Sequence, residues 1–189
     1  MTTDPHPWAA DLALLQAQVW ARLVRGVGDR HAPARHPTLA TVSPGGLPEA
    51  RTVVLRAADP AAGTLDIHTD LRSGKVAGLQ RNPNAALLIW DSAAQLQTRI
   101  TARVDILTGD AVATTWARVP QTSQAGYGTQ PAPGTPIERA LGYHKTPDPA
   151  AFAVLRCTVQ SIDALHLGPQ HRRARFDRAN GWLGQWLAP

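Results

Sequence analysis

The sequence has little of what marks several common protein classes. Its 189 residues include one cysteine, Cys157, so an internal disulfide and a cysteine-based metal cluster are excluded. No apolar run approaches the roughly 18–20 residues of a membrane helix. Residues 1–8 lack the basic start and apolar core of a secretion signal. We therefore expect a soluble, cytoplasmic protein that binds no membrane.

Motifs for hydrolysis, metal binding and dinucleotide binding are missing as well. The sequence contains no G-x-S-x-G, no H-E-x-x-H and no Walker loop, and no complete G-x-G-x-x-G follows a strand pattern. None of the seven histidines lies four residues from another. We expect no bound metal.

The composition is that of a folded protein, with 43% apolar and 17% charged residues. The length favours a single domain over residues 1–189, with an N-terminal helix within residues 1–30 packed on it. The formal charge is +5, and basic residues concentrate in residues 51–75 and 171–178 without forming a long run. A phosphorylated small molecule is favoured as the ligand over nucleic acid.

Periodicity predicts one long helix followed by many strands. The helix covers residues 4–28, with Asp4 as its cap, and shorter helices are expected at residues 75–81 and 110–118. Turn residues such as those at 43–46 separate the strands, so hairpins dominate. The prediction is a mainly β (α+β) fold, an antiparallel barrel with flanking helices. Its strands are expected at residues 38–42, 49–56, 64–69, 85–90, 96–107, 150–160, 162–167, 174–177 and 182–187, and a long loop at residues 119–136.

Two segments are candidates for holding an anion. Residues 51–56 are expected to form one strand with Arg51 and Arg56 on opposite faces. A guanidinium in an apolar strand needs an anionic partner, and its planar fork suits phosphate. Residues 69–75 lead from a strand into a helix, where Ser73 and Lys75 and the free helix N–H groups favour an anion. Solvated strand edges and an ordinary serine cap explain the same residues without a ligand.

Two further segments carry polar side chains on sheet faces. Gln97 and Arg99 share a face of the long strand at residues 96–107, and an amide that both donates and accepts suits a flavin ring edge. Residues 171–176 are basic with one aromatic, as expected of an RNA patch, a second anion site or a solvated face.

In their order along the chain, these motifs resemble the pyridoxamine 5′-phosphate oxidase superfamily, in particular its FMN-binding oxidase-like branch. The resemblance covers nearly all of the chain after about Pro37. It rests on residues 51–56, 69–75, 82–88, 97–99, 118–126 and the closing 187–189. It implies a split β-barrel that forms a homodimer, with FMN in a cleft between the subunits. Trp182 and Trp186 are candidate interface anchors.

The resemblance also implies which residues contact the cofactor. Gly74 replaces a family arginine that binds the phosphate, and Arg72 is expected to bind the phosphate in its place. The loop at residues 123–135 is expected to reach the flavin. The phosphate contacts fall on Arg51, Arg56, Ser73 and Lys75, the ring and ribityl contacts near Val54, Thr69 and Gln97, and one further flavin contact on Arg175.

The residues that correspond to the family's substrate contacts depart from the family pattern. The Arg-x-His that holds pyridoxal phosphate falls at residues 171–175, where the order differs, and a tryptophan expected near residues 165–167 is absent. The prediction is an FMN-dependent oxidoreductase with an unidentified, anionic small-molecule substrate. The alternatives are a true pyridoxamine or pyridoxine 5′-phosphate oxidase, and a non-catalytic flavin- or haem-binding protein.

Overall fold

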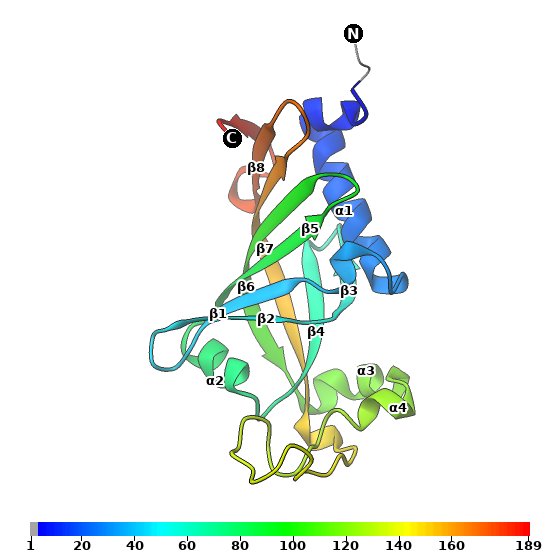
Figure 1. The fold of residues 1–189 in the computed structure, drawn as a ribbon, viewed down its shortest axis with the longest axis vertical. Helices are drawn as coiled ribbons and strands as arrows, with labels where there is room; N and C mark the ends of the chain where they lie inside the picture. The colour runs from blue at the N-terminus through cyan, green and yellow to red at the C-terminus, as the bar shows by residue number, and fades with distance from the viewer. Residues whose placement is uncertain (1–3) are drawn as a thin grey trace.

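The computed structural model describes residues 4–189, which form an elongated molecule built around one antiparallel sheet (Figure 1). The helices lie around this sheet, and every strand pairing is antiparallel. The strands are β1 (Thr38–Val42), β2 (Pro48–Thr52), β3 (Leu55–Asp59), β4 (Thr64–Asp70), β5 (Asn84–Asp91), β6 (Leu96–Leu107), β7 (Phe152–His166), β8 (Arg172–Asp177) and β9 (Gly184–Leu187). The α-helices are α1 (Leu12–Gly28), α2 (Gly74–Arg81), α3 (Ala113–Arg118) and α4 (Gln121–Gln124), and the 3-10 helices are η1 (Pro7–Ala10), η2 (Pro33–Arg35), η3 (Gly109–Val112), η4 (Pro149–Ala151) and η5 (Arg178–Asn180).

The order of the strands explains why the sheet curves into a split barrel. The main path runs β2-β1-β5-β6-β7-β4-β3, and β8 and β9 extend from β7. Strands β2 and β3 lie at opposite ends of this path, yet only two residues, Val53 and Val54, connect them along the chain. Because so short a link cannot span a flat sheet of this width, the two ends must come together. The predicted fold class is confirmed.

One strand prediction is wrong at the same point. Residues 49–56 were expected to form a single strand, but the chain leaves β2 after Thr52 and enters β3 at Leu55. The backbone N–H of Val53 donates to Pro37 at 3.0 Å, outside both strand pairings. The apolar residues of this segment continue through the break, so the sequence pattern gives no sign of it. Arg51 and Arg56 therefore belong to different strands.

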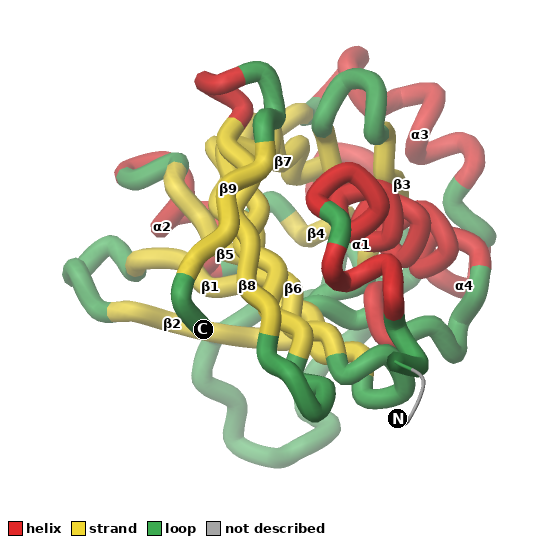
Figure 2. Tube along the Cα trace, turned by 90° about the horizontal axis from the view of Figure 1, so that it is seen from above, coloured by secondary structure: helices red, strands yellow, loops and turns green. Residues whose placement is uncertain are grey.

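Helix α1 packs along one side of the curved sheet, as the view in Figure 2 shows. It begins later than predicted, because Asp11 is its cap and accepts from the N–H of Leu14 at 2.8 Å. Asp4, the expected cap, instead accepts from the N–H of His6 and pairs with Arg172. Gly26 is buried within the helix, where a Cβ would come within 2.7 Å of the Ala34 backbone. The glycine thus permits the close approach of η2.

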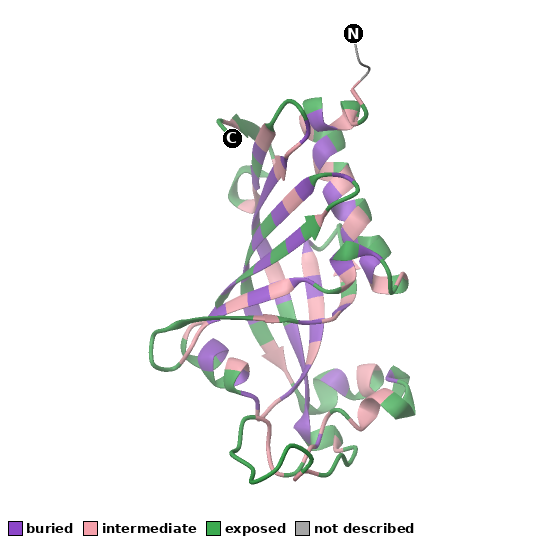
Figure 3. Ribbon diagram, in the orientation of Figure 1, coloured by how far each residue is buried: buried purple, intermediate pink, exposed green. Residues whose placement is uncertain are grey.

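Strand β6 follows its prediction closely. Its bounds are the expected ones, and buried and accessible positions alternate along its first ten residues. Strand β7 is a single strand of 15 residues, where two strands were predicted. The predicted break, at residue 161, falls at a β-bulge, where the pairing of β6 with β7 shifts in register between Thr101 and Ala102 of β6. Figure 3 shows the alternation of buried and exposed residues along the strands.

The long segment after α3 forms a second, smaller layer at one end of the sheet (Figure 1). Phe152 and Val154 of β7 pack there against Val112 and Val119. The loop that follows α4 contains a short bridge between Gln130 and His144 and is mostly accessible. None of the helices in residues 4–189 is both long and apolar enough to span a membrane.

Candidate functional site

A cluster of hydroxyl and cationic groups lies where β4 passes into α2. The hydroxyls of Thr69 and Ser73 are both buried and lie 3.3 Å apart. The Lys75 ammonium donates to Thr69 Oγ1 at 2.8 Å and to Ser73 Oγ at 3.0 Å. Ser73 occupies the cap position of α2, but its hydroxyl accepts no helix N–H. The alternative of an ordinary serine cap is therefore not supported, because the Ser73 hydroxyl faces the cluster instead.

Arg51 approaches the same cluster from β2. Its guanidinium donates to Thr41 Oγ1 at 2.6 Å and pairs with Glu49 at 2.7 Å. Burial, followed by the charge of Arg51, lowers the pKa of Lys75, and the charge of Asp70 only partly opposes them. We call Arg51, Thr69, Ser73 and Lys75 the cationic cradle.

The cradle suits the phosphate of a flavin mononucleotide. Its side chains offer hydroxyl, ammonium and guanidinium donors, and a helix begins beside them with its N–H groups. Within residues 4–189, no carboxylate forms an ion pair with Lys75. A phosphate at this point would supply the negative charge that the half-buried ammonium lacks.

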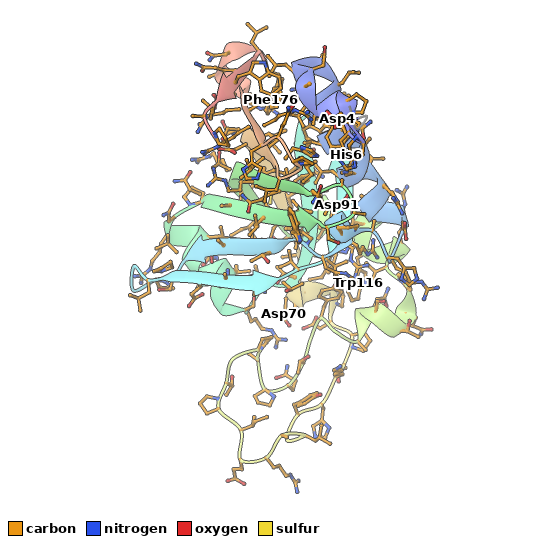
Figure 4. The ribbon with its side chains drawn as sticks, turned by 45° about the horizontal axis from the view of Figure 1, so that its top comes forward. Asp4, His6, Asp70, Asp91, Trp116 and Phe176 are labelled. Atoms are coloured by element: carbon orange, nitrogen blue, oxygen red, sulfur yellow. The ribbon has the colours of Figure 1, made fainter. Side chains whose placement is uncertain are left out.

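Arg72 does not join the cradle. Its guanidinium binds the buried Asp70 carboxylate at 2.6 and 3.0 Å and the Thr129 carbonyl at 3.0 Å. Asp70 also accepts from the N–H of Gly128 at 3.1 Å. Burial raises the pKa of Asp70, but the hydrogen bonds from Arg72 and Gly128 outweigh it and hold the pKa below its ordinary value. Asp70, labelled in Figure 4, and Arg72 thus tie the long loop to the segment before α2. The structure shows Arg72 bound to Asp70 and Thr129, and its expected contact with the phosphate stays a prediction.

Arg56 lies beside aromatic residues of the second layer. Burial, followed by the charge of Arg56, lowers the pKa of His68 to about 4. Burial raises the pKa of Tyr127, and Arg56 partly opposes this by its charge and a hydrogen bond. Both aromatic rings pack edge-on against Phe152, with centroids 5.0 Å away. Arg56 therefore shares no contact with Lys75 here, and Val54 lies partly buried in the link between β2 and β3.

Gln97 and Arg175 belong to another part of the molecule. Gln97 lies on β6 opposite Trp90 and Leu165, on the outward face of the sheet. Arg175 lies on β8 and forms an ion pair with Asp177 at 2.9 Å. In Figure 1, strand β8 lies in the upper part of the molecule and helix α2 in the lower part, so the two are well separated along the long axis. A single chain therefore does not bring Gln97 and Arg175 to the cradle, whereas Thr69, predicted as a ring or ribityl contact, lies within it.

One group of functional interest was missed by the sequence reasoning. Asp163, in the middle of β7, binds Arg99 of β6 and Arg173 of β8 at 2.7 and 2.9 Å. Burial raises the pKa of Asp163, but hydrogen bonds from Arg173 and Arg99 outweigh it and lower the pKa. The available signal was a single acidic residue among the apolar residues of segment 162–165, because a buried charge needs partners.

Neither a metal-ligand cluster nor a thiolate at neutral pH is present among the described residues. No cluster of three potential metal ligands occurs among residues 4–189. Cys157 is fully buried, and this burial raises the pKa of its thiol to about 12, so no thiolate forms near neutral pH. The arrangement is suited to holding an anionic cofactor that carries the chemistry itself.

Comparisons with known proteins identify the family to which the chain belongs. Residues 16–108 match the family described as "Pyridoxamine 5′-phosphate oxidase, FMN-binding domain". A pyridoxine/pyridoxamine 5′-phosphate oxidase of Xanthomonas axonopodis pv. citri is 33% identical over 155 residues, which are 80% of this chain and 68% of that protein. The enzyme of the same name from Microcystis aeruginosa is 41% identical over 83 residues, 44% of this chain but only 38% of the relative.

A solved structure has the same fold over its whole length. It is a pyridoxamine 5′-phosphate oxidase-related, FMN-binding protein of Nostoc punctiforme, with a TM-score of 0.77 and 24% identity, and the match covers 100% of both chains. At this identity the likeness establishes the fold alone. Together with the sequence matches, it leads to one conclusion: the chain belongs to the pyridoxamine 5′-phosphate oxidase family of FMN-binding proteins, and its cofactor is FMN.

Proposed function

We propose that the protein is an FMN-dependent oxidoreductase that acts in the cytoplasm as a homodimer. The observation that carries this proposal is the cationic cradle, in which the half-buried Lys75 binds two hydroxyl groups and no carboxylate of the described residues. When bound, FMN supplies the redox chemistry. The chain's own residues have the tasks of anchoring the phosphate, orienting the ring and shaping the substrate site.

The anchoring task falls on the cradle. Lys75 supplies a point charge next to the hydroxyls of Thr69 and Ser73, and Arg51, whose charge acts on Lys75, supplies a planar fork from β2. Arg56, on β3, is assigned to the phosphate by resemblance, and its charge also acts on His68 and Tyr127.

The dimer follows from the separation of the predicted contacts. Gln97 and Arg175 lie far along the sheet from the cradle of their own chain, so we assign them to the flavin held by the partner's cradle. The outward face near Gln97 also exposes Leu88 and Trp90, at 41% and 48%. Apolar side chains exposed beside a binding site favour burial against a second subunit. Trp186 is also exposed, whereas Trp182 packs against the core and under Arg178.

The substrate is not expected to be a vitamin B6 phosphate. Each arginine of the stretch that departs from the family pattern already has an aspartate partner: Arg172 binds Asp4, Arg173 binds Asp163 and Arg175 binds Asp177. The order of residues in this stretch also differs from the family pattern, and a site that holds a buried phosphate loses much of its affinity when the guanidinium fork is misplaced.

The test combines three measurements on purified protein. FMN reconstitution should give flavin absorbance at one FMN per chain, and light scattering should give the mass of two chains. Anaerobic stopped-flow mixing with pyridoxamine 5′-phosphate should leave the flavin spectrum unchanged, whereas NADH or NADPH is the next reductant to try. Rapid bleaching with release of pyridoxal 5′-phosphate would instead identify a true oxidase of that substrate. A one-chain mass would contradict the intersubunit site, and a flavin that no reductant bleaches would favour a non-catalytic flavoprotein.

A further inference from the structure

The ion pairs of Asp163 form a compact unit on the outward face of the sheet, which we call the arginine clamp: Arg99, Asp163 and Arg173. Arg99 donates to Asp163 Oδ2 at 2.7 Å, and Arg173 donates to the same oxygen at 2.9 Å and to Oδ1 at 3.2 Å. The three residues come from adjacent strands, β6, β7 and β8. Because the shared carboxylate sits between them, the two guanidinium groups are held close together.

The clamp carries an excess positive charge toward solvent. One carboxylate balances two guanidinium groups, and the side chain of Asp163 is only 12% exposed while those of Arg99 and Arg173 are 48% and 29% exposed. Each guanidinium has five N–H donors, and Asp163 takes up only some of them. Donors therefore remain free for a second carboxylate, which would complete the charge balance.

Apolar side chains surround the clamp on the same face. Strand register places Leu88 directly opposite Arg99, and Leu165 directly opposite Arg173. Trp90 lies opposite Gln97, in the next row of the sheet. Leu88 and Trp90 are both substantially exposed. A ligand with a carboxylate at one end and a flat apolar body fits this combination better than a phosphate or a wholly polar anion does.

We propose that the arginine clamp binds the carboxylate of a planar, apolar carboxylic acid and so defines the substrate class of the protein. This inference rests on the proposed function, because Gln97 of the adjacent row is the residue assigned to the partner's flavin. A substrate whose carboxylate binds Arg99 and Arg173 then has its apolar body over Leu88 and Trp90, next to the ring of the partner's flavin. Asp163 is a positioning residue, since it holds both guanidinium groups and does not touch the substrate.

The experiment uses the FMN-loaded dimer and two probes of the same shape. 1-Naphthoate carries the carboxylate, and 1-naphthamide is its neutral counterpart; binding of each is followed by the flavin difference spectrum and by calorimetry. Wild-type protein should bind naphthoate at least about ten-fold more tightly than naphthamide, as expected for hydrogen bonds to a charged group. Arg99→Gln and Arg173→Gln should each weaken naphthoate about ten-fold or more, with little change for naphthamide.

The matched control is Arg103→Gln, which removes an exposed arginine from the same face of β6 outside the clamp. Its naphthoate affinity should equal that of the wild type. Equal affinities of the wild type for the two probes would overturn the inference, even if a clamp variant failed to fold. So would wild-type naphthoate affinity in folded, flavin-loaded Arg99→Gln and Arg173→Gln. A protein without flavin absorbance after reconstitution would overturn the proposed function, and this inference with it, by a separate signal.

Discussion

The molecule has two clusters of cations that differ in how their charges are balanced. In the cationic cradle, Lys75 binds hydroxyl groups, and the carboxylate that pairs with Arg51 is Glu49, 45% exposed at the rim. In the arginine clamp, a carboxylate that is only 12% exposed lies between the two guanidinium groups. Both clusters bear positive charge, yet of the two only the clamp supplies its own buried counterion.

Because of this difference, we expect the cradle to contribute mainly to FMN binding and the clamp to contribute also to the stability of the fold. A half-buried cation without a counterion costs folding free energy, and an anionic ligand recovers that cost on binding. A buried carboxylate with two guanidinium partners contributes to the fold, because removing it leaves positive charges unpaired. Changes in the cradle should therefore affect FMN more than folding, and changes in the clamp should affect folding as well as its ligand.

The largest expected effect comes from Lys75→Met. FMN affinity should fall by about 3 kcal/mol, because the variant loses a charge-assisted bond and leaves phosphate charge unpaired. The apoprotein should melt at the same or a higher temperature, since burial and Arg51 already disfavour the charged ammonium. Flavin fluorescence titration and scanning calorimetry measure the two quantities. Arg81→Met removes an exposed cation from the same helix that bonds only the Pro44 carbonyl, so it should leave the FMN affinity unchanged. An apoprotein strongly destabilised by Lys75→Met would contradict the comparison.

Arg51→Ala should weaken FMN by roughly 2–3 kcal/mol, again with little effect on the melting temperature of the apoprotein. This loss of FMN affinity is expected to be no larger than that of Lys75→Met, because the Arg51 guanidinium has Glu49 as a second partner. Arg51→Lys should recover only part of the affinity, since lysine lacks the planar fork. The same titration tests both variants, and wild-type affinity in Arg51→Ala would exclude this residue from the anchor.

Asp163→Asn should lower the free energy of unfolding by about 1–2 kcal/mol, because Arg99 and Arg173 are then held together without a counterion. The loss is moderate because both arginines remain partly solvated. Urea unfolding of the apoprotein measures it. Glu138→Gln, in the exposed loop, is the matched charge removal and should leave the unfolding curve unchanged. A stability equal to the wild type in Asp163→Asn would mean that the clamp does not support the fold.

The smallest effect concerns His68, beside Arg56. Its pKa in the folded state is about 4, against an ordinary value of 6.5, so the unfolded chain takes up the proton first as the pH falls. The stability due to neutral His68 is therefore complete above pH 6.5 and is lost as the pH falls toward 4. Allowing for partial exposure, wild type should lose about 1 kcal/mol more than His68→Gln between pH 7 and 4.5. His171→Gln, at an exposed histidine, should keep the wild-type pH profile.

The sequence was sufficient wherever a local pattern carries the information. The alternation along β6 predicted its bounds and both of its faces, and the turn at residues 43–46 predicted a hairpin that the structure confirms with Gly46 at a φ of 86°. The segment at residues 69–75 predicted a group of donors at the start of a helix. Each of these depends on neighbours a few residues apart.

What the sequence did not predict depends on register between distant strands. Asp163 binds Arg99 and Arg173, which are separated from it by 64 and 10 positions in the sequence, and no local pattern links the three. The break between β2 and β3 has the same origin, because hydrogen bonding to β1 and β4, not the apolar pattern, ends each strand. Arg56 was consequently grouped with Arg51, although the structure places it beside Tyr127.

The most direct test of the central claim, that the cationic cradle binds the phosphate of FMN, compares FMN with riboflavin. The two differ only by that phosphate, so their ring and ribityl contacts cancel. Wild-type protein should bind FMN at least roughly a hundred-fold more tightly than riboflavin, as expected for several charge-assisted bonds. Lys75→Met should reduce this preference mainly by weakening FMN. Equal affinity of the wild type for FMN and riboflavin, or an undiminished preference in Lys75→Met, would contradict the claim.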